Sequence, residues 1–171
     1  MTLNRRTLLG MTSATAACAA AAAWFRPFGA SNAQAGETFE VTKTEDEWRK
    51  SLTPQQFAVL RKHGTEQPHS SPLEAEHRPG TFDCAGCALP LYGSAAKFES
   101  GTGWPSFYDH LPNAVVTKSD YSLLIPRTEV HCRRCGGHLG HVFPDGPKPT
   151  GQRYCMNGVA MTFRPGTSSG T

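Results

Sequence analysis

The spacing of apolar and polar positions near the start of the body of the chain predicts two short helices. Thr44 stands three residues before Glu47, and Trp48 begins an apolar stripe. This is a capping box, in which the threonine and glutamate side chains bind free backbone amides of the first turn. A second start follows at Thr53, with a proline in the first helical position, and we expect Gly64 to end that helix.

Beyond Gly80, short apolar runs with two-residue alternation are separated by turn residues, which is typical of β-strands. The segment before them, 65–80, is rich in proline and is expected to be irregular. The runs that predict strands are 80–84, 88–92, 114–118, 122–132, 138–143 and 153–163. The sequence therefore predicts a mainly antiparallel β domain with two small helices near its N-terminus.

The composition of the 171 residues fits one such domain. Apolar residues make up 38% and charged residues 18%, which excludes a highly charged disordered chain and a coiled coil. The 17 glycines and 13 prolines favour turns and short strands over long helices.

The net charge of +3 comes from the first 35 residues. Three of the 17 basic side chains, Arg5, Arg6 and Arg26, lie there without any acidic residue, and the other 14 balance the 14 acidic side chains of the chain. A basic surface for nucleic acid is therefore not expected on the body of the protein.

Residues 1–35 have the pattern of an export signal. Arg5-Arg6 precedes a mildly apolar, alanine-rich run that ends at Phe25, and Ala33-Gln34-Ala35 offers a cleavage pattern. Paired arginines before such a run predict a twin-arginine signal and a periplasmic location, with 36–171 as the mature domain. An ordinary Sec signal or an uncleaved anchor is the alternative, although the run is weakly apolar for a stable membrane span.

Two CxxC pairs are the strongest local chemical signal: Cys84 with Cys87, and Cys132 with Cys135. Two such turns can present four thiolates to one cation, which predicts a closed structural zinc site that fastens distant strands together. Redox-active pairs or two disulfides are the alternatives. A redox CxxC normally begins a helix in a βαβ unit, whereas these pairs lie between predicted strands.

Cys155 remains once the four candidate ligands are assigned and Cys18 leaves with the leader. A buried, inert cysteine is the ordinary alternative. However, Arg153 and Asn157 stand two residues before and after it, and on a strand all three would share a face. A cation beside the thiol would favour the nucleophilic thiolate.

Two further segments carry candidate chemistry. His138 and His141 follow the second CxxC pair and suit proton transfer, although His138 serves equally well as a structural residue. The glycine-rich loop around Trp104 suits an apolar ligand wall.

These motifs together resemble the B-type methionine-R-sulfoxide reductases over about residues 44–164. The matching segments are HGTE at 63–66, SGTGWPSF at 100–107, RTEVHCRRCGGHLGHVFPDGP at 127–147 and PTGQRYCMN at 149–157. The resemblance implies two antiparallel β-sheets with short N-terminal helices packed outside, and zinc on the four paired cysteines.

The resemblance also implies roles for individual residues. Cys155 would attack the sulfoxide sulfur and become a sulfenic acid, and His141 would protonate the departing oxygen. The resemblance gives assisting roles to His138, Asn157 and Arg153, and it places Trp104 and Phe143 on the substrate wall. The implied substrates are oxidised proteins and methionine sulfoxide.

Thr102 departs from the pattern, since many members of the family carry a resolving cysteine there. Threonine cannot form a disulfide, so an external thiol donor such as a thioredoxin-like protein is expected to recycle Cys155. A zinc-ribbon adaptor and an extracytoplasmic thiol peroxidase are the competing functions. The first leaves the Cys155, histidine and tryptophan motifs unexplained.

Overall fold

The computed structural model describes residues 38–123 and 125–166, so the expected leader lies outside the described residues. Two α-helices, two 3₁₀ turns and nine strands are found in the described part of the chain. In chain order they are α1 (Glu45–Ser51), α2 (Pro54–Lys62), β1 (Gly80–Cys84), β2 (Pro90–Gly93), η1 (Ser94–Ala96), β3 (Lys97–Phe98), β4 (Ser106–Phe107), β5 (Val115–Asp120), β6 (Arg127–Cys132), β7 (His138–Phe143), β8 (Arg153–Met156), η2 (Gly158–Ala160) and β9 (Met161–Pro165).

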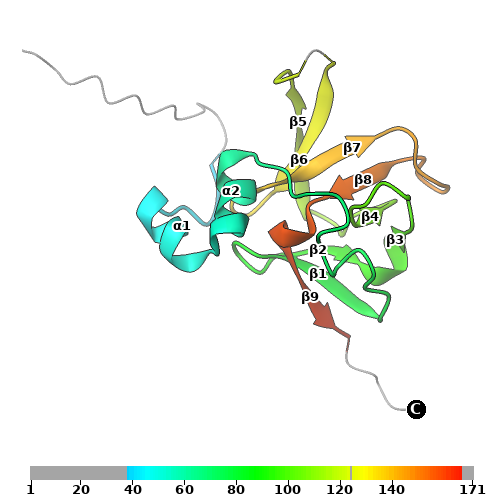
Figure 1. Cartoon of the computed structure of the whole chain (residues 1–171), viewed down its shortest axis with the longest axis horizontal. Coiled ribbons are helices and arrows are strands. Elements are labelled where there is room, and N and C mark those ends of the chain that lie inside the picture. The colour runs from blue at the N-terminus through cyan, green and yellow to red at the C-terminus, as the bar shows by residue number, and fades with distance from the viewer. Residues whose placement is uncertain (1–37, 124, 167–171) are drawn as a thin grey trace, which may run out of the picture. The chain divides into compact units, whose positions relative to one another are not determined.

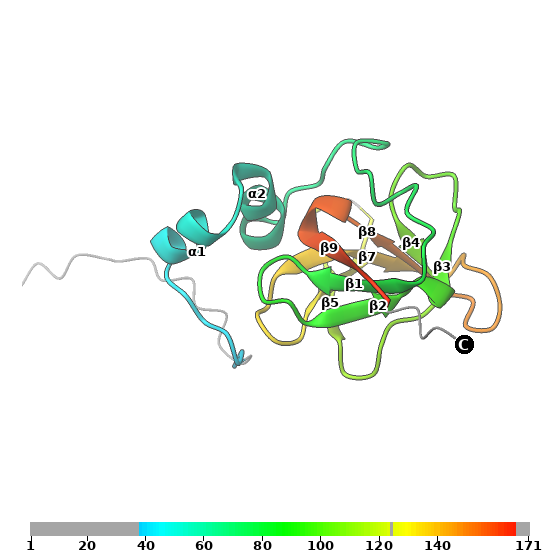
Figure 2. The same cartoon turned by 90° about the horizontal axis from the view of Figure 1, so that it is seen from below.

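The strands form two antiparallel sheets, which confirms the expected mainly β class (Figure 1). One sheet has three strands in the order β2-β1-β9, and the other has six in the order β3-β4-β8-β7-β6-β5. Helix α2 packs against β7 and η2. Figure 2 shows α1 and α2 together on one side of the strands.

Both helices begin at the predicted capping boxes, with Thr44 and Thr53 as the N-caps. The end of α2 differs by one residue from the prediction, because His63 adopts the left-handed conformation at φ 55°. Gly64 follows and donates its amide to the Ala58 carbonyl at 2.9 Å. A Cβ on Gly64 would lie 2.9 Å from that same oxygen, so the glycine serves a close backbone approach.

Three aromatic rings join the two sheets in the core. Tyr92 of β2 stacks on Phe107 of β4 with ring centroids 4.3 Å apart, and Phe82 of β1 meets Phe107 edge-on at 4.9 Å. All three side chains are fully buried. Aromatic pairs in these arrangements stabilise a core beyond the area that they bury.

The predicted strand at 153–163 is wrong as a single element. β8 ends at Met156, and after the η2 turn the chain enters the other sheet as β9, where it pairs with β1. The sequence did not predict the short strands β3 and β4, because each has only two residues and is too short to show an alternation of apolar and polar positions. The predicted strand at 122–132 begins five residues before β6, whereas the remaining predicted strands agree with the structure to within two residues, and 138–143 matches the bounds of β7.

Candidate active site

The register of the six-stranded sheet places five polar residues in one row across five strands. Lys118 lies opposite Glu129, Glu129 opposite His141, His141 opposite Cys155, and Cys155 opposite Ser106. Directly opposed residues of antiparallel strands project from the same face of a sheet. The row therefore brings the candidate nucleophile between an imidazole and a hydroxyl group.

Gly140 makes the close approach of β7 and β8 possible beside this row. A Cβ at Gly140 would lie 2.2 Å from the Cys155 carbonyl oxygen and 3.0 Å from the Met156 Cα atom. Real side chains do not tolerate such contacts with backbone atoms, so glycine is required for the pairing that sets His141 against Cys155.

Cys155 is half-buried, and among the described residues it is the only cysteine outside the cluster of paired cysteines. Its Sγ atom lies 3.7 Å from Oγ1 of Thr102. The loop that carries Thr102 and Trp104 is fastened to β8 by a hydrogen bond of 3.0 Å from the Met156 amide to the Pro105 carbonyl. The structure thus brings the loop that the sequence singled out against the candidate nucleophile.

His141 donates a hydrogen bond from Nε2 to Oδ2 of Asp120 at 2.8 Å. Burial lowers the pKa of His141, and the Asp120 carboxylate opposes that shift. Hydrogen bonds from Ser122, and then from His141 and Arg127, hold the pKa of Asp120 well below its usual range. The carboxylate therefore stays ionised, and it fixes the orientation of the imidazole beside Cys155.

His138 is buried and donates from Nδ1 to Oε1 of Glu129 at 2.7 Å. His63 binds the same oxygen at 3.0 Å, and Lys118 lies 3.2 Å from the other one. Burial alone would raise the pKa of Glu129, but the hydrogen bonds from the two histidines bring it well below its usual range. His138 thus helps to hold a buried carboxylate, which supports the structural alternative for this residue.

The rings of His138 and His141 lie 5.4 Å apart, although residues three apart on a regular strand face opposite sides. A β-bulge explains their closeness. His131 and Val130 of β6 pair with His138 and Gly140, so one extra residue is accommodated on β7. This irregularity has no signature that the alternation pattern alone could reveal.

Arg153 forms two hydrogen bonds with Asp145, at 2.9 and 2.7 Å, and its guanidinium lies 4.5 Å from the ring centroid of Phe143. The bonds to Asp145 raise the pKa of Arg153, with a smaller contribution from Cys155. Arg153 therefore presents a fixed positive charge to the candidate nucleophile. A pocket of about 420 Å³ adjoins this group and includes Thr102.

Asn157 lies just beyond the end of β8, so it does not continue the strand alternation that the sequence suggested. Its side-chain nitrogen donates to the Leu139 carbonyl at 3.0 Å, and its side-chain oxygen accepts from the Glu66 amide at 2.9 Å. Asn157 therefore ties the end of β8 to β7 and to the segment that follows α2.

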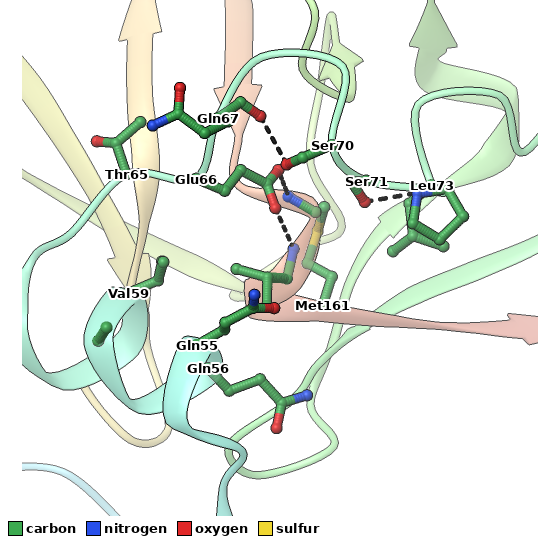
Figure 3. Close-up of a pocket in the computed structure, with 14 residues that line it drawn as sticks. Gln55, Gln56, Val59, Thr65, Glu66, Gln67, Ser70, Ser71, Leu73 and Met161 are labelled. Atoms are coloured by element: carbon green, nitrogen blue, oxygen red, sulfur yellow. Dashed lines mark hydrogen bonds between the residues drawn. The ribbon is translucent and has the colours of Figure 1, made fainter.

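Glu66 is a residue whose contribution the sequence reasoning missed. Its backbone oxygen accepts a hydrogen bond of 3.3 Å from Nε1 of Trp104. Its carboxylate accepts from the amides of Gly158 and Val159 at 2.5 and 2.9 Å (Figure 3). Burial raises the pKa of Glu66 against these two bonds. The only sequence signal was the acidic residue in the HGTE motif.

Glu66 also lines a second pocket, which Figure 3 shows. This cavity of about 560 Å³ is lined by α2, by the segment 65–73 and by residues around η2. Cys155 is not among the lining residues, and neither is His141. The candidate catalytic side chains therefore lie in the polar row and not in this cavity.

The four paired cysteines gather at the junction of the two sheets. Cys84 ends β1 of the smaller sheet and Cys132 ends β6 of the larger one. The Sγ atoms all lie within 4.8 Å of one another, with 3.7 Å from Cys84 to Cys135 and 3.5 Å from Cys87 to Cys132. These distances exceed the S–S bond of about 2.05 Å, so the thiols are not joined as disulfides.

The cluster fits one tetrahedral metal ion. Zinc–sulfur bonds of about 2.3 Å place tetrahedral sulfur atoms about 3.8 Å apart, close to the observed spacing. Hydrogen bonds from Cys132 and the other two thiols lower the pKa of Cys87, whereas interactions led by Cys132 raise that of Cys84. A divalent cation removes the conflict that prevents all four thiols from ionising together.

Together these features define a class of protein: a two-sheet β fold with a half-buried free thiol beside an oriented histidine, and a separate four-cysteine cluster that could hold one metal ion. The family model described as "SelR domain" matches residues 52–165. The chain belongs to this family.

Several curated proteins described as "Peptide methionine sulfoxide reductase MsrB" are similar to the chain. The protein of Leifsonia xyli subsp. xyli is 52% identical over 129 residues, which cover 74% of this chain and 93% of the relative. That of Methanosarcina barkeri is 54% identical over 125 residues, covering 72% and 88%. That of Agrobacterium fabrum is 49% identical over 127 residues, covering 74% and 94%.

Within residues 38–123 and 125–166, the structure contains no helix that is both long and apolar enough to cross a membrane.

Proposed function

We propose that this chain is a peptide-methionine (R)-S-oxide reductase, which repairs oxidised methionine with Cys155 as the reacting thiol. Membership of the SelR family and the named relatives support the reaction. The single observation that carries the assignment of the nucleophile is the register that sets Cys155 opposite His141. No other described cysteine stands outside the metal cluster.

The reaction transfers one oxygen atom. The Cys155 sulfur attacks the sulfoxide sulfur, the substrate oxygen passes to Cys155, and the sulfide product leaves. Methionine is reduced by two electrons and the cysteine is oxidised by two, to the sulfenic acid. His141 supplies the proton that the oxygen needs as its bond to the substrate sulfur breaks.

The other residues of the site support this step. Trp104 and Phe143 provide the wall that holds the methyl group of the substrate. Arg153, fixed by Asp145, favours the thiolate, because an opposite charge stabilises the ionised form. His138 and Asn157 assist by holding the strands of the site in place, as their bonds to Glu129 and to Leu139 indicate.

Recycling requires two thiols from outside the chain. The first attacks the sulfenic acid and releases water, which leaves a mixed disulfide on Cys155, and the second attacks that disulfide and frees the Cys155 thiol. Thr102 stands where a resolving cysteine would have to lie, only 3.7 Å from the Cys155 sulfur. A thioredoxin-like protein is the type of reductant that this requirement favours.

The decisive experiment presents the two sulfoxide epimers separately, with dithiothreitol as reductant. We expect turnover of the R epimer only, and none with Cys155→Ser, because serine lacks a thiolate. Peroxide consumption in place of sulfoxide reduction would support a thiol peroxidase and contradict the proposal. Sulfoxide reduction by the Cys155→Ser variant would contradict the choice of nucleophile.

Zinc is the metal that the four-thiolate cluster favours, because tetrahedral thiolate sites of this kind are its usual structural sites. Four protein ligands leave no open position, so the zinc would hold the two sheets together and would not bind the substrate. The chain would then contain one zinc ion.

Replacing one ligand, as in Cys84→Ser, should release the zinc and destabilise the fold, since structural zinc contributes on the order of 10 kcal/mol. Metal content and the thermal midpoint measure these effects. Ser51→Ala, on the exposed end of α1, serves as the control and should retain zinc. A folded, metal-free wild-type protein with four titratable thiols would refute the zinc assignment.

The pH dependence of single-turnover reduction should follow His141. Burial lowers its pKa from the usual 6.5 and Asp120 opposes that shift, so the reduction rate should fall as the pH rises through this lowered value. Asp120→Asn removes the opposing carboxylate and should move the profile about one unit further toward acid. The exposed Asp46→Asn variant should leave it in place. A profile that is identical in Asp120→Asn would exclude His141 as the titrating donor.

The twin-arginine pattern of residues 1–35 supports export of the protein to a bacterial periplasm. That route carries folded proteins, so zinc would be loaded onto reduced cysteines inside the cell. The mature enzyme would then act on oxidised proteins outside the cytoplasm.

A further inference from the structure

A chain of three hydroxyl groups leads away from the Cys155 sulfur. Oγ1 of Thr102 lies 3.7 Å from Sγ, and Oγ of Ser100 lies 2.8 Å from Oγ1 of Thr102. Oγ of Ser106 lies 2.7 Å from Ser100, and it donates to the Trp104 carbonyl at 3.2 Å. The contact with sulfur is longer than the others because sulfur is the larger atom, and such bonds shorten when the acceptor is charged.

Each hydroxyl has one proton, so the chain must be ordered from one end to the other. The Trp104 carbonyl can only accept, and therefore Ser106 donates to it. Ser100 then donates to Ser106, and Thr102 donates to Ser100. In this order the Cys155 thiol is the donor to Thr102, and every oxygen in the chain accepts at least one bond, since Ser100 also accepts from the Thr102 amide at 3.4 Å.

The same atoms serve the thiolate when the order reverses. Ser106 then donates to Ser100, Ser100 donates to Thr102, and Thr102 donates to the Cys155 sulfur. The reversal sacrifices only the bond from Ser106 to the Trp104 carbonyl, which is the longest oxygen–oxygen contact of the chain at 3.2 Å. In return, the negatively charged Cys155 sulfur accepts a hydrogen bond from Thr102. The other hydrogen bonds of the chain polarise the Thr102 hydroxyl and so strengthen that bond.

Charged and titratable groups reach Cys155 from the other directions. His141, backed by Asp120, faces it from β7, and Arg153 interacts with it from its own strand with Asp145 attached. On the side of β4 and its preceding loop, the groups in this network are neutral hydroxyls. A change at Thr102 therefore removes a hydrogen bond without altering any of these charges.

We propose that Thr102 is a catalytic residue, whose hydroxyl donates a hydrogen bond to the Cys155 thiolate, and that Ser100 and Ser106 are positioning residues for that hydroxyl. The inference rests on the proposed function only in taking Cys155 as the reacting thiol. It gives Thr102 an active role beyond the absence of a resolving cysteine.

The test measures the alkylation rate of Cys155 by iodoacetamide across pH, in the zinc-loaded full-length chain, by mass spectrometry of the peptide that contains Cys155. Thr102→Val keeps the shape of the side chain and removes the hydroxyl. We expect its titration midpoint to rise by about one unit, so that alkylation below both midpoints slows about 10-fold. Thr102→Ser should retain the wild-type titration midpoint, as should the matched control Thr162→Val, at an exposed position of β9.

Ser100→Ala tests whether Ser100 positions the Thr102 hydroxyl, as distinct from the direct contact of that hydroxyl with Cys155. It leaves the Thr102 hydroxyl in place but removes the group that orders it, so the midpoint should rise by less than in Thr102→Val. Ser100→Thr restores a hydroxyl and should return the midpoint toward the wild-type value. Retained zinc and an unchanged thermal midpoint in each variant check that the fold is intact.

An unchanged midpoint in Thr102→Val would overturn the proposal. The proposal would also be overturned if Thr102→Ser had the same titration midpoint as Thr102→Val. The change in midpoint would then depend on the shape of the side chain and not on its hydroxyl group. The alkylation experiment needs no sulfoxide. A wild-type chain that fails to reduce sulfoxides would therefore count against the proposed function, whereas the effect of the Thr102 variants on alkylation could still be measured.

Discussion

The antiparallel pairing of β7 with β8 is the constraint on which the site depends. Gly140 lets the two strands approach, since any Cβ there would meet the Cys155 carbonyl. That register sets His141 opposite Cys155, and the neighbouring pairings extend the polar row to Glu129 on one side and Ser106 on the other. A shift by one residue would turn the Cys155 side chain toward the opposite face of the sheet.

Two features outside the row keep this register in place. The cysteine cluster brings the ends of β1 and β6 together, where the proposed zinc would join them, and the stacked rings of Tyr92 and Phe107 join the sheets in the core. Both connect the smaller sheet to the larger one, so the strands of the site are held from outside it. In the proposed reaction the half-buried Cys155 would pass through charged and oxidised states within this scaffold.

Features of the structure could be predicted from the sequence where they depend on residues that are close together in the chain. The capping boxes at Thr44 and Thr53 and the paired cysteines follow from short spacings, and the structure contains both boxes and brings the cysteines together. The sequence could not reveal the bulge that brings His138 beside His141, because alternation assumes a regular strand. Nor could it reveal Glu66, whose bonds to Trp104 and to η2 join segments that are far apart in the chain.

The most direct test of the central claim is mass spectrometry of the protein after one substrate turnover without reductant. The account predicts one added oxygen on the peptide that contains Cys155, trappable by a sulfenic-acid reagent, with zinc still bound. A loss of two hydrogens instead, with Cys155 in a disulfide to one of the paired cysteines, would contradict it. That result would show that the cluster takes part in recycling and is not a closed metal site.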